Sequence, residues 1–284
     1  MSQPLFAFFG TPHIATLVLD RLQANGLVPA LVVTAPDRPA GRGLQLSPSP
    51  VKLWALERGI DVVTPQTLKD PTFILELQNT EWDVFVVSMY AKIIPKAVLE
   101  IPKAGCLNVH PSLLPKFRGP SPVLSAILQD ERETGVTIMQ LDEKMDEGPI
   151  VAQAKIELDE DVWPPKGSEF EALLAQEGGD LLAEVLPLWV EGKITPEEQN
   201  HKDATYTGKF SDEDARLDLG SDSRHNFLKI RAFDKSPKPY FLTPSGKRVV
   251  VKEAEFKNGQ LLITRVTPEG KKEMSYEDFL RGQQ

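Results

Sequence analysis

Hydrophobic and polar residues alternate in two ways along the first 190 positions. Short apolar runs rich in β-branched and aromatic residues predict strands at residues 5–9, 28–34, 84–88, 105–110 and 136–141. Apolar residues at helical spacing predict helices at 14–23, 50–58, 70–78, 122–129 and 168–190. Because strands that alternate with helices form βαβ units, we predict an α/β, Rossmann-like domain whose parallel sheet is covered on both faces.

The pattern changes after this domain. A polar run at residues 191–203 predicts a linker, and helical segments are expected at 211–216 and 224–233. Strands are expected at 239–243, 248–255 and 260–266. The last two are joined by Lys257-Asn-Gly259, and Asn-Gly between apolar strands is a strong hairpin signal. We therefore expect a first domain at residues 1–190, a linker at 191–206 and a small β domain at 207–284.

Charge is distributed unevenly between these regions. The net charge is −9, yet residues 1–200 carry 16 basic against 28 acidic residues, whereas residues 201–284 carry 16 against 13. The basic excess is greatest between residues 224 and 257. This region is a candidate surface for a phosphate backbone, although an ordinary solvated surface has the same composition.

The sequence also predicts the compartment. The N-terminal Met-Ser-Gln-Pro leads into an apolar run without a basic segment or a cleavage site, and no apolar run approaches the roughly 20 residues of a membrane span. We therefore expect a cytoplasmic protein. Cys106 is the single cysteine, which excludes an intramolecular disulfide, and its apolar strand predicts that it is buried.

Candidate chemistry lies at the end of one predicted strand. Residues i and i+2 of an extended chain face the same way, so Asn108 and His110 point together until Pro111 ends the strand. A carboxylate, Asp146, follows the next predicted strand. An amide that donates to an oxyanion, an imidazole that exchanges protons and a carboxylate that orients the imidazole suit transfer of an acyl-like group to an amine.

The fold class predicts where a ligand binds. Gly10, Ser88, His110 and Leu141 each end a predicted strand, and ligands of open α/β sheets gather at the carboxyl ends of the strands. We therefore expect these residues at one edge of the sheet. The turn after the first strand lacks the three glycines of a dinucleotide fingerprint, so a nicotinamide cofactor is not expected.

Each feature also has a structural interpretation. An Asn-x-His pair at a strand end is more often structural than catalytic, and Met-Asp-Glu-Gly is a common turn sequence. A metal site built on His110 and Asp146 is a further alternative. The other three histidines, His13, His201 and His225, show no ligand spacing with His110, so we expect no metal.

Taken together, these residues resemble a known family. The motif Asn108-x-His110-x-Ser-Leu-Leu-Pro115, with Asp146 following in a Met-Asp-x-Gly turn, is similar to that of the formyltransferases that use 10-formyltetrahydrofolate. The resemblance covers almost the whole chain. It implies an enzyme with a Rossmann-like catalytic domain and a small, OB-like C-terminal β-barrel. Here the second domain lacks a stretch that longer relatives have between Ala254 and Leu262, so we expect a reduced or open sheet.

The resemblance implies roles for individual residues. Asn108, His110 and Asp146 would be catalytic, with Asp146 accepting a hydrogen bond from the imidazole. The residues implied for the folate pocket are Ser88, Tyr90, Lys92, Ile93, Ile94, Ser112, Leu113, Leu114, Pro115 and Asp142. The family's usual Tyr-Gly-x-Ile is replaced here by a sequence with Ala91, which would be strained if that position needs a positive φ angle.

Residues 36–50 resemble a mobile, tRNA-contacting loop of the family members that formylate methionyl-tRNA. This implies a monomeric enzyme that formylates methionyl-initiator tRNA for translation initiation. The tRNA contacts implied are Arg38, Arg42, Lys235, Lys238, Lys247 and Arg248. Many relatives have lysines where this chain has Leu44 and Gln45, so we expect a weaker salt dependence of tRNA binding.

Two alternatives remain open. A formyltransferase acting on a nucleotide-linked amino sugar would share the same catalytic residues and the same folate. An RNA-binding protein that has lost its activity would not need the intact set of Asn108, His110 and Asp146.

Overall fold

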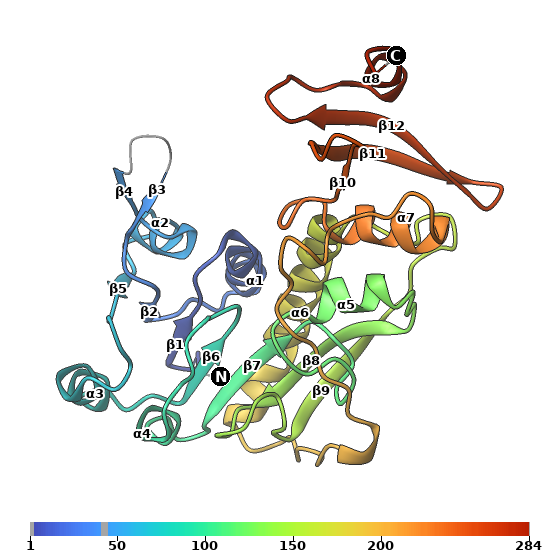
Figure 1. Cartoon of the computed structure of the whole chain (residues 1–284). Helices are drawn as coiled ribbons and strands as arrows, with labels where there is room; N and C mark the ends of the chain where they lie inside the picture. Colours follow the sequence, from blue (N-terminus) through green and yellow to red (C-terminus); the bar gives the residue numbers. More distant parts are fainter. Residues whose placement is uncertain (1–2, 41–44, 284) are drawn as a thin grey trace. The chain divides into compact units, whose positions relative to one another are not determined.

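The computed structural model describes residues 3–40 and 45–283 of the chain (Figure 1). Its helices and strands are β1 (Phe6–Phe9), α1 (His13–Ala24), β2 (Leu31–Val33), β3 (Arg38–Ala40), β4 (Gln45–Ser47), α2 (Pro50–Leu56), β5 (Asp61–Val63), α3 (Pro71–Gln78), β6 (Val84–Val87), α4 (Lys96–Leu99), β7 (Cys106–His110), α5 (Pro122–Leu128), β8 (Thr134–Gln140), β9 (Ile150–Ile156), α6 (Gly167–Val190), η1 (His201–Asp203), α7 (Ser223–Ala232), β10 (Tyr240–Leu242), β11 (Arg248–Lys257), β12 (Gln260–Pro268), β13 (Met274–Ser275) and α8 (Tyr276–Arg281).

The described residues form two compact units that do not follow the order of the chain. The first unit comprises Met1–Arg118, Gly135–Ile156 and Ala172–Thr205, and the second comprises Gly119–Thr134, Glu157–Glu171 and Tyr206–Gln284. The expected division at 1–190, 191–206 and 207–284 is consecutive instead. It stays a prediction about which segments fold independently.

The first unit is built on a seven-stranded sheet in the order β5-β2-β1-β6-β7-β8-β9 (Figure 1). The first five of these strands are parallel, as the βαβ pattern predicts. β8 is antiparallel to β7, with His110 opposite Thr137. The sheet is therefore mixed: the predicted parallel arrangement holds for its first five strands, and β8 departs from it. α5, the helix between β7 and β8, belongs to the second unit, so it does not serve as the crossover that a parallel strand needs.

The antiparallel course of β8 moves one expected strand end to the other edge of the sheet. The Leu141 amide donates to the carbonyl of Cys106, at the start of β7, over 2.8 Å. Gly10, Ser88 and His110 follow or end parallel strands at the carboxyl edge. Leu141 therefore does not share their edge, contrary to the prediction.

Alternate residues of the central strands pack into two cores. Phe8 and Leu107 belong to the core on the side of α1 and α6, whereas Phe9 and Cys106 belong to the core on the side of α3 and α4. Asn108 and His110 follow Cys106 at intervals of two, so they point toward the α3 and α4 side. The sheet thus fixes the face on which their chemistry takes place.

Helix starts follow from local sequence. In α2, Pro50 occupies the first turn and Ser49 Oγ accepts from the amide of Lys52 at 3.0 Å. In α3, Pro71 does the same and Asp70 Oδ1 accepts from the amide of Thr72 at 2.9 Å. Proline is tolerated in the first turn because its missing N–H has no partner there. These signals explain why both helices begin where the sequence predicts.

The segment that resembles a tRNA-contacting loop contains two short strands. β3 and β4 pair antiparallel, with Arg38 opposite Ser47 and Pro39 opposite Leu46. Residues 41–44, including Arg42, lie outside the described residues. The described ends of the segment are thus strands rather than irregular loop.

The second unit contains a four-stranded antiparallel sheet in the order β10-β11-β12-β13. Its core includes Leu217, Ile230, Phe241, Val249 and Val266. Among the described residues, the edge strands β10 and β13 do not pair with each other, so the sheet is open, as the shortened sequence predicts. The described strands of this sheet therefore form no closed barrel.

Two local predictions for the second unit have opposite outcomes. Asn258 and Gly259 both have positive φ angles, 52° and 76°, and they join β11 to β12, which confirms the expected hairpin. Residues 211–216 form turns, so the predicted helix there is wrong. The Asp214 carboxylate accepts from both the amide and the hydroxyl of Ser211, and such local bonds compete with a helix.

Candidate active site

β7 places Asn108 and His110 on one face of the sheet at its carboxyl end. His110 is 4% exposed, whereas Asn108 is half-buried. Within the part of the chain that the structure describes, the Asn108 side chain makes no hydrogen bond. Its amide is therefore available to a ligand at this strand end.

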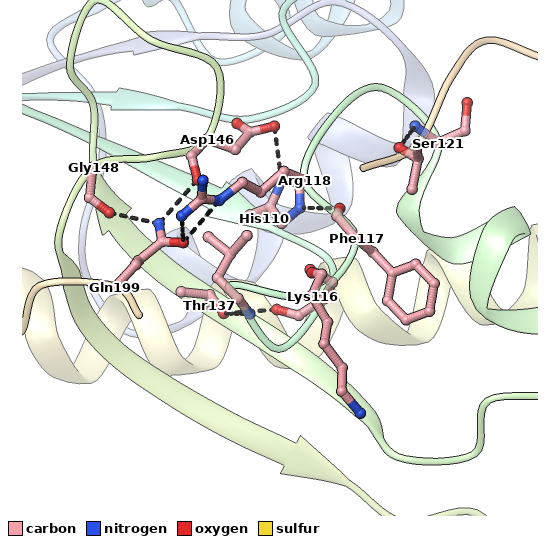
Figure 2. A network of polar contacts seen from close by, with 12 residues as sticks. His110, Lys116, Phe117, Arg118, Ser121, Thr137, Asp146, Gly148 and Gln199 are labelled. Carbon is pink, nitrogen blue, oxygen red and sulfur yellow. Dashed lines mark hydrogen bonds and ion pairs between the residues drawn. The ribbon is translucent and has the colours of Figure 1, made fainter. Parts of the chain in front are cut away.

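His110 is held through both ring nitrogens. Nε2 lies 3.1 Å from the Phe117 carbonyl oxygen, to which it donates, and Nδ1 lies 3.9 Å from Asp146 Oδ2 (Figure 2). The second distance suits an ion pair but is too long for a hydrogen bond. The Phe117 carbonyl thus fixes the tautomer, a role expected for Asp146. Nδ1 is left as the nitrogen that can accept a proton, and Asp146 stabilises the imidazolium that results.

Burial is the largest influence on the pKa of His110. It lowers this pKa below the ordinary value, while Asp146 and then the Phe117 carbonyl act in the opposite direction. Desolvation disfavours the charged imidazolium, so the ring is neutral near neutral pH. A neutral imidazole is the form that can act as a general base.

This lowered pKa predicts a pH dependence of stability. The unfolded chain binds a proton at about pH 6.5, above the pKa of the folded state, so His110 stabilises the fold fully above that pH. Its contribution to the free energy of unfolding is lost as the pH falls below about 6.5. Urea unfolding at about pH 7.5 and 5.5 should show a larger loss in the wild type than in His110→Gln. Equal losses in the two proteins would contradict the buried, neutral histidine.

The turn between β8 and β9 presents Asp146 in an uncommon backbone conformation. Its φ angle is 55°, which costs a residue other than glycine about 1 kcal/mol. Its side chain is 15% exposed. The turn packs over the face of the sheet that carries His110, since Leu141 lies against the same core as Cys106. The carboxylate thereby reaches His110 although β8 ends at the opposite edge.

Sequence reasoning missed a buried polar cluster beside this pair. Arg118 is fully buried and donates through Nε and Nη2 to Gln199 Oε1 at 3.1 and 2.7 Å. Nη2 also lies 3.0 Å from His201 Nδ1, and Nη1 lies 3.6 Å from Glu147. Gln199 donates to the backbone oxygens of Asp146 and Gly148 (Figure 2). Gln199 and His201 lie in the polar run that predicts a linker, so nothing in the sequence indicated that they lie at the site. Arg118, three residues after the Ser-Leu-Leu-Pro115 motif, was the one available signal.

The Ser-Leu-Leu-Pro segment is held by two polar side chains. Thr137 Oγ1 donates to the Ser112 carbonyl at 2.6 Å and accepts from the Leu114 amide at 3.1 Å. Gln153 Nε2 donates to the Leu114 carbonyl at 2.8 Å. The Ser112 hydroxyl donates to the Lys116 carbonyl, and Leu114 is 3% exposed. Ser112 and Leu114 therefore shape the loop, and Leu113 and Pro115 stay candidates for ligand contact.

The other candidate folate segment follows β6. Ile93 is 91% exposed, while Ile94 and Ser88 are buried. Within the described residues, the buried Tyr90 hydroxyl has no hydrogen-bond partner, and burial raises the pKa of Tyr90 to about 12. A buried hydroxyl without a partner suits a ligand that supplies one.

Local geometry corrects one expectation about this segment and supports another. Met89 has the positive φ angle, 52°, whereas Ala91 does not, so no strain arises at Ala91. Lys96 of α4 pairs with Glu143 at 3.2 Å. This contact brings the turn that contains Asp142 next to the segment after β6, as a shared folate pocket requires. The Asp142 carboxylate itself accepts from the Lys144 amide at 2.8 Å.

Lys92 is positioned by the backbone. Its ammonium donates to the carbonyls of Pro65 and Gln66 at 2.7 and 2.9 Å. Burial, and then the charge of Arg38, lower the pKa of Lys92. Arg38 is exposed on β3 and close enough to influence this folate candidate. The candidate tRNA segment and the candidate folate segment are thus neighbours.

The basic stretch of the second unit is partly neutralised. Arg224 pairs with Asp130 at 2.8 Å, and Arg248 pairs with Asp212 at 2.9 Å while it stacks over Tyr240. Four exposed lysines, by contrast, have no such contact within the described residues: Lys235, Lys238, Lys247 and Lys252. These four are the candidate contacts to a phosphate backbone. Arg248 could bind phosphate in the same way only if its ion pair with Asp212 were broken.

No three histidine, cysteine, aspartate or glutamate side chains of the described residues are grouped as a metal site requires. Among the helices that the structure describes, none combines the length and the apolar character that crossing a membrane demands.

Comparison with known proteins agrees with the motif. The sequence profile described as Formyl transferase matches residues 4–179. A methionyl-tRNA formyltransferase from Chloroflexus aggregans is 46% identical over 82% of this chain and 74% of its own length. Another, from Methylococcus capsulatus, is 36% identical over 96% of this chain and 95% of its own.

Solved structures show the same fold. A methionyl-tRNA formyltransferase from Clostridium thermocellum superposes with a TM-score of 0.63 at 16% identity, covering 94% of this chain and 99% of that one. WlaRD, a sugar 3N-formyl transferase crystallised in the presence of dTDP and 5-N-formyl-THF, gives 0.64 at 19% identity, covering 96% and 100%. At these identities the likeness concerns the fold alone. The sequence relatives and the matched profile are decisive, and this chain belongs to the formyl transferase family, among the methionyl-tRNA formyltransferases.

Proposed function

We propose that this chain transfers the formyl group of 10-formyltetrahydrofolate to the α-amine of methionine on initiator tRNA. The observation that carries the proposal is the pair of buried His110 and half-buried Asp146, 3.9 Å apart, beside the available amide of Asn108. The acceptor is supported by the relatives, which are named methionyl-tRNA formyltransferases. A monomer in the cytoplasm, as expected from the sequence, belongs to the same proposal.

The three side chains account for the proton and charge movements of the reaction. The folate supplies the formyl carbon, and a bond forms between this carbon and the amine nitrogen while its bond to N10 breaks. His110 Nδ1 takes the proton that the amine loses and returns it to N10. Asn108 donates to the oxygen that becomes negative, a contact that can contribute about 3 kcal/mol. Asp146 stabilises the transient imidazolium.

The folate has candidate partners on two sides. The buried Tyr90 hydroxyl offers a hydrogen bond, and the exposed Ile93 offers an apolar surface that a ring system can cover. The turn containing Asp142 lies on the other side, joined to α4 by Lys96 and Glu143. This arrangement supports a pocket for a flat, partly polar ring next to His110.

The tRNA has two candidate contact regions. The charge of Arg38, on β3, acts on Lys92 of the candidate folate segment, so a phosphate bound by Arg38 would lie near the candidate formyl-donor site. The exposed Lys235, Lys238 and Lys247 offer charge to the phosphate backbone. Such contacts are electrostatic and should weaken with salt.

Arg42 provides a test of the tRNA contact, although it lies outside the described residues. Replacing Arg42 by alanine should raise the KM for methionyl-tRNA about tenfold and reduce turnover, because a charged hydrogen bond contributes about 1.5 kcal/mol. Steady-state kinetics at fixed folate measure both constants. Arg281→Ala, an exposed arginine on α8, is the control and should leave them unchanged. Unchanged kinetics of Arg42→Ala would remove the segment from the tRNA interface.

The function itself is tested by offering two acceptors. Purified protein with 10-formyltetrahydrofolate is incubated with methionyl-initiator tRNA or with a nucleotide-linked amino sugar. We expect formyl-methionine on the tRNA and no formylated sugar. Formylation of the sugar alone would favour the alternative acceptor. No formylation of either amine would remove the catalytic interpretation.

A further inference from the structure

Gln199 is a buried residue of the first unit that lies close to the His110 and Asp146 pair. It is 4% exposed, and its side-chain amide contacts two segments that flank His110 (Figure 2). Nε2 donates to the backbone oxygens of Asp146 and Gly148 at 2.9 and 2.7 Å. Oε1 accepts twice from Arg118, at 3.1 and 2.7 Å. We infer that Gln199 is a positioning residue that sets the Asp146 carboxylate against His110. This inference rests on the proposed function for its kinetic consequence.

The bonding of Gln199 is complete. A primary amide has two N–H donors and one oxygen with two lone pairs, and all four are used. Because a buried polar group needs partners whatever its role, the complete bonding fixes how the amide is oriented, and the role follows from where its bonds end. Two of the four bonds end on the turn that contains Asp146, whose φ angle of 55° requires support from its surroundings. Gln199 supplies that support.

Arg118 extends the effect to the other side of the imidazole. It directly follows Phe117, whose carbonyl accepts from His110 Nε2. The Arg118 guanidinium in turn binds Gln199. One chain of contacts therefore runs from the Nε2 side of His110, through Arg118 and Gln199, to Asp146 on the Nδ1 side. A shift of Gln199 would change the distance between Asp146 and Nδ1.

Several titratable groups surround this chain of contacts. Asp146 faces Nδ1 directly, and Glu147 lies 3.6 Å from Arg118 and 3.5 Å from Lys144. His201 lies 3.0 Å from Arg118. Of these groups, Asp146 raises the pKa of His110 against the larger effect of burial. If Asp146 moves away, this pKa should fall further.

Two substitutions separate positioning from simple support of Arg118. Gln199→Glu keeps an oxygen that accepts from Arg118 but has no N–H to donate to Asp146 and Gly148. Gln199→Met has a side chain of similar size and loses both the acceptor and the donor. We expect kcat for formyl transfer to fall by about 10²-fold in both variants, with each KM within about threefold, because misplacement near 1 Å costs about that much. Gln153→Met removes another loop-holding amide, and it serves as the control for the pKa of His110 rather than for kcat, because Gln153 Nε2 holds Leu114 of the candidate folate segment.

A second measurement does not depend on activity. With ¹³C-labelled histidine, and with His110→Gln to assign the signal, NMR titration gives the pKa of His110 directly. It should be lower in Gln199→Met than in the wild type, and it should be unchanged in Gln153→Met.

Three results would overturn the inference. One is wild-type kcat in Gln199→Glu, which would mean that Gln199 serves Arg118 alone. The second is an unchanged pKa of His110 in a folded Gln199→Met. The third is the same fall of that pKa in Gln153→Met. If Gln199→Met does not fold, the kcat of Gln199→Glu decides. If the wild type formylates neither acceptor, the proposed function fails while the titration still tests the position of Asp146.

Discussion

Replacing His110 by glutamine should lower kcat for formyl transfer by about 10³-fold, the largest effect expected of any single substitution in this chain. Glutamine is the matched replacement because its Nε2 can still donate to the Phe117 carbonyl, as the imidazole Nε2 does. It has no nitrogen that accepts a proton toward Asp146. The variant should therefore keep the loop and lose the proton transfer.

Rapid-quench measurement of a single turnover isolates the chemical step of this variant. Thermal unfolding should show that His110→Gln remains folded. His225→Gln, an exposed histidine on α7, is the control and should keep the wild-type rate. If His110→Gln turned over within about tenfold of the wild type, the histidine could not be the group that carries the proton.

Replacing Asn108 by leucine should lower kcat by about 10²-fold to 10³-fold with little change in KM. Leucine has nearly the same size, so the pocket keeps its shape while the N–H donor is lost. A donor that acts on the developing oxyanion contributes more to the transition state than to the bound substrates, so its loss lowers kcat selectively.

A second asparagine variant serves as the control in the same kinetic assay. Asn25→Leu removes an exposed amide that donates to the Arg21 carbonyl at the end of α1, and it should change neither constant. A rise in KM with unchanged kcat in Asn108→Leu would assign Asn108 to substrate binding. That outcome would contradict its role as an oxyanion donor.

Much of the first unit could be predicted because its signals are local. The buried strands β1, β6 and β7 are continuous apolar runs, and α2 and α3 carry proline and a capping side chain at their starts. β5 and α4 were missed because three or four residues are too few to show a period. β9 was missed although its burial alternates in the manner of a half-exposed strand, so that signal was present.

The direction of β8 could not be predicted from its own residues. An apolar run specifies a buried strand and leaves open whether it lies parallel or antiparallel to its neighbour. The decisive fact is that α5 packs within the second unit, which depends on contacts with residues far along the chain. The location of Leu141 at the opposite edge follows from this.

The candidate site likewise has local features that could be predicted and long-range contacts that could not. Asn108 and His110 could be placed together because strand alternation is local, and Asp146 was found by its motif. The contacts that hold the site are long-range: Arg118 and Gln199 are 81 residues apart, and Gln199 and Asp146 are 53 apart. The Phe117 carbonyl has no sequence signature, because every residue has one. Sequence therefore indicates which groups react and leaves open how they are held.

The central claim is that the amine acceptor is methionine on tRNA, and a competition experiment tests it most directly. Methionyl-initiator tRNA and a nucleotide-linked amino sugar, at equal concentration in one mixture with 10-formyltetrahydrofolate, compete for the same site. The ratio of formylated products gives the ratio of kcat/KM. We predict that the tRNA is preferred by at least about 10³-fold, because it presents many more phosphates to the proposed basic contacts than a nucleotide-linked sugar does. A ratio near one, or a preference for the sugar, would contradict the claim.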